Sequence, residues 1–132
     1  MLSDMDVDSL RTRIESLLME IEYAPVECDG HSRMVAYVLN RHGIRYQIYC
    51  GKVRTPAGII PLHFWVEVQG LVIDYRARMW LGQDAPHGVF LPSLGMHYDG
   101  LYVNQPVLSK AVFEILCTRI SAPRLATAFP AV

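Results

Sequence analysis

From residue 63 to residue 74 the chain reads HFWVEVQGLVID, and this stretch decides the fold. Two runs rich in β-branched and aromatic residues flank the dipeptide Gln69-Gly70, which has the length of a tight hairpin connection. With a two-residue turn, Val68 faces Leu71, and counting outward Trp65 faces Asp74. The stretch therefore predicts an antiparallel hairpin with a fixed register.

This register brings His63 and Asp74 to one face of the hairpin as diagonal neighbours. Diagonal pairs lie roughly 7–8 Å apart at the backbone, within reach of two polar side chains that lean together. A carboxylate placed in this way can accept the imidazole N–H, fix its tautomer and stabilise the imidazolium. The alternative is a half-buried strand histidine beside an acid that meets solvent at the strand end.

Cys28 stands at the start of a predicted helix. Residues 29–41 carry an apolar stripe with helical spacing, and Gly43 follows as a C-terminal stop. A thiol at the helix start lies at the positive end of the helix dipole, beside backbone N–H groups that can stabilise an oxyanion. Glu27 and Asp29 oppose the thiolate by their charge. The alternative is a small buried cysteine that packs the helix start.

The order of Cys28, His63 and Asp74 and their predicted elements suggest a Cys-His-Asp triad. The stretch from residue 28 to about residue 80 resembles the transglutaminase-like branch of the papain-like cysteine hydrolases. The hairpin is similar to the His-x-Trp-Val-Glu-Val hairpin of bacterial members. The resemblance implies an α+β fold in which a helix carrying the cysteine packs on an antiparallel sheet carrying the histidine and aspartate. It also implies that Cys28 is the nucleophile, His63 the general base and acid, and Asp74 the residue that orients His63.

The expected activity is therefore attack of a thiol on an amide or acyl carbonyl of a peptide or protein. Transfer to water gives a cysteine peptidase or glutamine deamidase, and transfer to an amine gives a transamidase; hydrolysis is ranked first because it needs no second binding site. The alternative is a catalytically silent binding or inhibitor module on the same fold. The acidic neighbours of Cys28, and the lack of a glutamine upstream to complete an oxyanion hole, motivate this alternative.

Three further residues are candidates for substrate binding: Trp65, His31 and Arg76. Trp65 is expected to pack beside the triad. His31 is interpreted as a solvent-facing helix residue or a second polar group near the thiol. Arg76 and Arg78 are expected to ring the mouth of the site or to solvate a strand edge.

Metal binding is the competing chemistry. Cys28 and His31 are one helical turn apart, and His42 and Cys50 follow. Structural zinc sites usually show two close ligand pairs, and only one is present here. We therefore expect no metal and no other cofactor.

The rest of the chain fits one domain over residues 1–132. A first helix is expected from Asp8 or Ser9 to about Glu22, and a C-terminal helix from residues 104–106 to about Ile120. Residues 82–100 are expected to form a long loop, with a short strand at 89–91 and a role as a lid or substrate wall. This loop and the 121–132 tail are candidate surfaces for a protein partner.

The composition is that of an independently folding unit, with 52% hydrophobic residues and a net charge of −1. The basic residues are scattered, which argues against a nucleic-acid surface. No stretch approaches the roughly 18 apolar residues of a membrane span. Three cysteines without a recognisable signal peptide predict reduced thiols and a cytoplasmic location.

Overall fold

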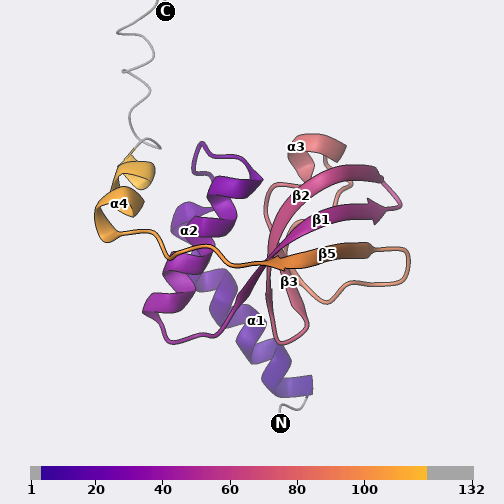
Figure 1. Cartoon of the computed structure of the whole chain (residues 1–132). Coiled ribbons are helices and arrows are strands. Elements are labelled where there is room, and N and C mark those ends of the chain that lie inside the picture. The colour runs from indigo at the N-terminus through magenta and orange to yellow at the C-terminus, as the bar shows by residue number, and fades with distance from the viewer. Residues whose placement is uncertain (1–3, 119–132) are drawn as a thin grey trace, which may run out of the picture.

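The fold combines helices with one antiparallel sheet, as a computed structural model describes it for residues 4–118 (Figure 1). The α+β class predicted from the sequence is thereby confirmed. The helical segments are α1 (Asp4–Leu18), the 3₁₀ turn η1 (Met19–Ile21), α2 (Cys28–Arg41), α3 (Arg78–Leu81) and α4 (Lys110–Thr118). The strands are β1 (Gln47–Thr55), β2 (Gly58–Val68), β3 (Leu71–Asp74), β4 (Gly88–Phe90) and β5 (His97–Val103). None of the helices in the described part is long and apolar enough to cross a membrane.

The predicted hairpin is confirmed with its register. Val68 pairs with Leu71 and Val66 pairs with Ile73. Gln69 and Gly70 both have positive φ, 50° and 86°, as a two-residue turn matched to the strand twist requires. His63, Trp65 and Asp74 consequently project from one face of the sheet.

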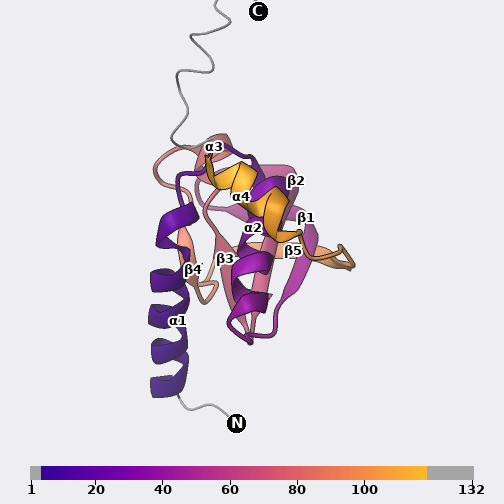
Figure 2. The same ribbon diagram turned by 90° about the vertical axis from the view of Figure 1, so that its left-hand side faces the viewer.

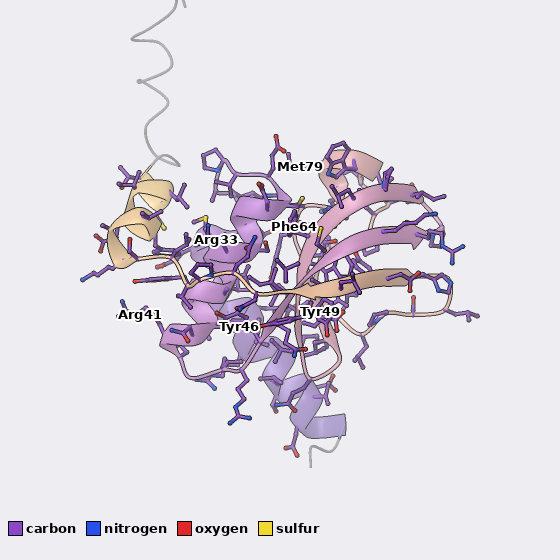
Figure 3. All side chains as sticks on the ribbon, viewed as in Figure 1. Arg33, Arg41, Tyr46, Tyr49, Phe64 and Met79 are labelled. Atoms are coloured by element: carbon purple, nitrogen blue, oxygen red, sulfur yellow. The ribbon has the colours of Figure 1, made fainter. Side chains whose placement is uncertain are left out.

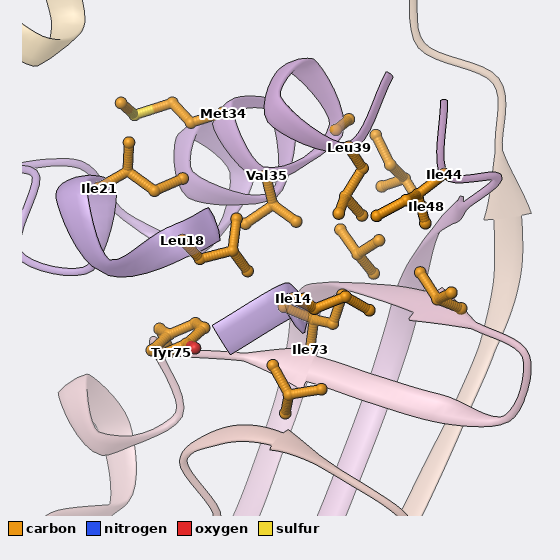
Figure 4. Packing of buried hydrophobic residues seen from close by; sticks show 14 of the residues in the cluster. Ile14, Leu18, Ile21, Met34, Val35, Leu39, Ile44, Ile48, Ile73 and Tyr75 are labelled. Atoms are coloured by element: carbon orange, nitrogen blue, oxygen red, sulfur yellow. The ribbon is translucent and has the colours of Figure 1, made fainter. Parts of the chain in front are cut away.

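The sheet has the strand order β4-β3-β2-β1-β5, and every neighbouring pair is antiparallel. On one face, α1 and α2 bury the main apolar cluster (Figures 1 and 4). Helix α2 begins and ends as predicted, at Cys28 and before Gly43, which has a φ of 70°. The first helix starts earlier than expected, at Asp4, and the 3₁₀ turn replaces its last residues.

The opposite face holds a smaller apolar cluster around Trp65. Trp65 is 1% exposed and packs with Val53, Ile60 and Val72. The rings of Tyr49 and Tyr98 lie against it, with centroids 6.1 and 5.0 Å away. Trp65 therefore links β2, its own strand, with β1, β3 and β5, which carry these residues.

Strand β5 corrects the expectation of a continuous loop over residues 82–100. The predicted short strand is present as β4, but His97–Val103 also forms a strand, paired with β1 along its length. Its close approach depends on Gly100, where an added Cβ would lie 2.6 Å from the Cys50 carbonyl oxygen and 2.7 Å from the Trp65 ring. The polar residues and glycines in this stretch hid the strand, because β5 is an edge strand with little burial.

Helix α4 packs on the outer side of α2 (Figure 2). Tyr37 of α2 and Phe113 of α4 stack with ring centroids 4.1 Å apart. The helix begins at Lys110, several residues after the predicted start at residues 104–106. Ile120 and the 121–132 tail lie outside the described residues.

Replacing Trp65 with alanine should destabilise the domain strongly. Removing a large buried aromatic side chain typically costs about 3–5 kcal/mol, and here it would also remove the ring against which Tyr49 and Tyr98 pack. Thermal and urea unfolding would measure the loss. Trp80→Ala is the matched control, because Trp80 is 58% exposed and should unfold almost as the wild type does. Equal stability of the two variants would contradict a core role for Trp65.

Candidate active site

The structure brings His63 and Asp74 into direct contact. The Nε2 atom of His63 lies 3.0 Å from each carboxylate oxygen of Asp74, and both side chains are buried. The pairing follows from the hairpin register, which places the two residues diagonally on one sheet face. An Nε2–H group donating to the carboxylate fixes the tautomer and directs Nδ1 away from Asp74.

Both oxygens of Asp74 have further donors. One accepts the backbone N–H groups of Arg76 and Ala77, at 2.9 and 3.1 Å. The other accepts the hydroxyl of Tyr98, at 2.8 Å. A buried carboxylate is costly unless it is fully hydrogen-bonded, and this set of donors provides that compensation. The carboxylate is therefore held in one position against the imidazole.

Tyr98 is a site residue that the sequence reasoning missed. It lies on β5, whose strand character was not recognised, and it reaches Asp74 across the smaller cluster. Burial, together with the charge of Asp74, raises the pKa of Tyr98 well above its ordinary value, so the hydroxyl stays a donor. Alternation along residues 97–103 was the only local signal that could have indicated it.

Cys28 is the first residue of α2 and lies beside His63. The Nδ1 atom of His63 is buried and has no hydrogen-bond partner among the described residues, while Cys28 is close enough to raise the pKa of the ring. Catalytic contacts are often loose before substrate binds, so this geometry suits a thiol–imidazole pair. The N–H groups of the first turn of a helix lack intrahelical acceptors, and Cys28 is the first residue of α2.

The protonation of His63 is shifted by its surroundings. Burial would lower its pKa, but the hydrogen bond with Asp74 and the nearby Cys28 outweigh burial and raise the pKa to about 9. His63 is consequently an imidazolium at neutral pH.

His31 does not face solvent, and that interpretation is wrong. The side chain is 4% exposed, and its Nε2 lies 3.1 Å from the carbonyl oxygen of Ile21. Burial, with a contribution from the Arg76 charge, lowers the pKa of His31 to about 3. His31 is therefore a neutral residue that ties α2 to the end of η1.

Arg76 does not solvate a strand edge, because it is buried, and its expected place at the mouth of the site stays a prediction. Its guanidinium is 7% exposed and donates to the carbonyl oxygens of Glu22, Ala24 and Val26, at 2.7 to 2.8 Å. These residues form the segment that leads into Cys28. Burial lowers the pKa of Arg76, and the charge of Asp74 partly offsets this. Arg76 thus fixes the approach of the chain to the candidate nucleophile.

Trp65, His31 and Arg76 are all buried, and they line a very small internal cavity together with Cys28 and Asp74. These three residues therefore support the geometry of the site. Their direct contact with a substrate stays a prediction. In the described residues, no group of three or more histidine, cysteine or acidic side chains is arranged to hold a metal ion.

A larger open space lies next to the segment that precedes Cys28. A cavity of about 440 Å³ is lined by the 22–27 segment and by Tyr75, Arg76 and Met79. Figure 3 shows Met79 on α3, facing the N-terminal end of α2 across this space.

Comparison with known proteins gives no further guide, because no family model, curated protein or solved structure matches the chain. The resemblance to transglutaminase-like cysteine hydrolases therefore stays a prediction.

Replacing Asp74 with asparagine should lower the pKa of His63 from about 9, because the charge of Asp74 and its hydrogen bond raise this pKa while burial lowers it. Tyr98→Phe should change it less, since it keeps the carboxylate and removes only one of the donors that bind Asp74. NMR titration of the imidazole would measure both shifts. An unchanged pKa in Asp74→Asn would contradict the pairing.

The same pair predicts a pH dependence of stability. The folded-state pKa of His63 lies above its ordinary value, so the pair contributes its full stabilisation below about pH 6.5 and loses it as the pH rises through about 9. In Asp74→Asn, the free energy of unfolding should no longer decrease as the pH rises from 6.5 to 9.

Replacing Arg76 with lysine should destabilise the domain by roughly 2–4 kcal/mol, because one ammonium cannot reach three separate carbonyl oxygens. Urea unfolding would measure the loss. Arg78→Lys is the control, since Arg78 is exposed at the start of α3 and should be neutral. Equal unfolding midpoints of the two variants would show that the three hydrogen bonds do not hold the 22–26 segment.

Proposed function

We propose that this protein is a thiol-dependent amide hydrolase or acyl transferase of the transglutaminase-like, papain-like kind, with Cys28, His63 and Asp74 as its triad. The observation that carries the proposal is the His63–Asp74 pair beside a cysteine at a helix start. Structural ion pairs also raise histidine pKa values, but a buried imidazole with one nitrogen bound to a carboxylate and a cysteine close by is the arrangement that nucleophilic catalysis needs.

In the first step, the sulfur of Cys28 attacks the carbonyl carbon and forms a C–S bond. The oxyanion lies near the N–H groups at the start of α2, and the Nδ1 proton of His63 passes to the leaving amine as the C–N bond breaks. The product is a thioester on Cys28, with His63 neutral.

In the second step, His63 takes a proton from the acceptor, which attacks the thioester carbonyl. The C–S bond breaks, and the thiolate and imidazolium are restored. Asp74 stabilises each imidazolium without itself accepting the proton. Water as acceptor gives hydrolysis, which we rank first, and an amine gives transamidation.

A catalytically silent binding module is the second candidate. One observation favours it: the backbone N–H of Gly30, in the first turn of α2, is bound at 2.8 Å by the carboxylate of Asp29. This donor is then occupied, and the carboxylate adds negative charge close to the site where an oxyanion would form.

Iodoacetamide should alkylate Cys28 at pH 7 roughly tenfold or more faster than Cys50 and Cys117. Burial raises the pKa values of Cys50 and Cys117, so both should react slowly. Mass spectrometry of peptides would give the three rates. His63→Ala should reduce the Cys28 rate to that of the other two, whereas His42→Ala, at an exposed position, should leave it unchanged.

Equal slow rates at all three cysteines would favour the silent module. With peptide, glutamine and thioester substrates, Cys28→Ala should abolish the turnover shown by the wild type, and added amine would reveal transamidation. Full turnover by Cys28→Ala would show that the nucleophile is a different residue.

A further inference from the structure

A row of three side chains crosses the sheet beside Cys28. Cys50 of β1 pairs with Phe64 of β2 on one side and with Leu101 of β5 on the other. Residues directly opposite each other in antiparallel strands project from the same face. Phe64, Cys50 and Leu101 therefore form one apolar row.

The row begins at the candidate nucleophile. Phe64 lines the small cavity that also contains Cys28 and Ser32, and it packs against the cluster that α2 covers. Figure 3 shows Phe64 where the N-terminal part of α2 meets the sheet. Burial and then the neighbouring Cys28 raise the pKa of Cys50, which agrees with a place close to the thiol.

The far part of the row is open to solvent. Leu101 is 79% exposed, and Leu62, two residues before Phe64 on β2, is 65% exposed. Helix α2 covers the same sheet face further along but starts at Cys28, so the face beyond its first residue has no covering element in the described chain. An apolar surface next to a reactive group is typical of a binding site.

The row is short along the strand direction. The next cross-strand pair on this face of β1 and β5 is Lys52 with Asp99, and both are exposed and charged. Two residues of a strand span roughly 6.6–6.8 Å, so on β1 and β5 the apolar surface ends within the length of one large side chain. Glu27 and Asp29, on either side of Cys28, disfavour an anionic group at the same place.

We propose that Phe64, Cys50 and Leu101 form a specificity subsite, which binds one large aliphatic or aromatic side chain of the acyl group attacked by Cys28. This inference rests on the proposed role of Cys28 as nucleophile. The favoured substrates are amides or thioesters whose acyl part carries an apolar side chain, and acidic acyl groups are disfavoured.

Two alkylating probes test the subsite without requiring turnover: iodoacetamide and N-phenethyl iodoacetamide. For each protein, the ratio of the two Cys28 alkylation rates is divided by the same ratio for free glutathione. Burial of the phenethyl group against the row should give a corrected ratio of roughly 10 or more in the wild type. Leu101→Ser should reduce the ratio at least threefold, while Leu101→Met should keep it.

Ile115→Ser is the matched control, because Ile115 is 62% exposed on α4, on the opposite side of α2 from the sheet (Figure 1). It should leave the ratio unchanged. A corrected ratio near 1 in the wild type, or equal ratios in Leu101→Ser and the wild type, would overturn the subsite. A different outcome is that Cys28 reacts slowly with iodoacetamide while the corrected ratio still depends on Leu101. This result would contradict the role of Cys28 as nucleophile and support the apolar subsite.

Discussion

The buried carboxylate of Asp74 is the interaction on which the rest of the site depends. It accepts hydrogen bonds from His63, from Tyr98 and from two backbone N–H groups, so it joins β2, β5 and the chain that follows β3. A buried charge is tolerated only where donors replace the lost water, and loss of any one leaves part of the charge uncompensated. The need to satisfy Asp74 therefore restricts where each of these elements can lie.

Arg76, two residues further on, extends the same constraint to the helical layer. Its backbone N–H binds Asp74, and its guanidinium binds three carbonyl groups of the segment before Cys28. The position of His63 on the sheet and the position of Cys28 on α2 are thus set by neighbouring residues of one short stretch. This explains how a small domain can align His63 of the sheet with Cys28 of the helical layer.

The residues behind the site and those in front of it have different properties. Trp65, His31 and Arg76 are buried and bound to the protein itself, which suits residues that maintain geometry. Leu62, Leu101 and Met79 are exposed and are available to a ligand. In the proposed function, reactivity depends on the buried set and substrate preference on the exposed set, so substitutions in the second set should change selectivity at little cost in stability.

The sequence by itself determined the elements whose signals are local. A two-residue turn sets the register of residues 63–74, and with it the contact of His63 with Asp74; helical spacing and Gly43 set the limits of α2. Only the tertiary structure decided the place of β5, the Tyr98 hydrogen bond and the burial of His31 and Arg76. Each of these depends on partners distant in sequence. Strand β5 pairs with β1, and Arg76 binds carbonyl groups 50 to 54 positions earlier in the chain. Local pattern fixes which face a side chain occupies, but only packing decides whether another element covers that face.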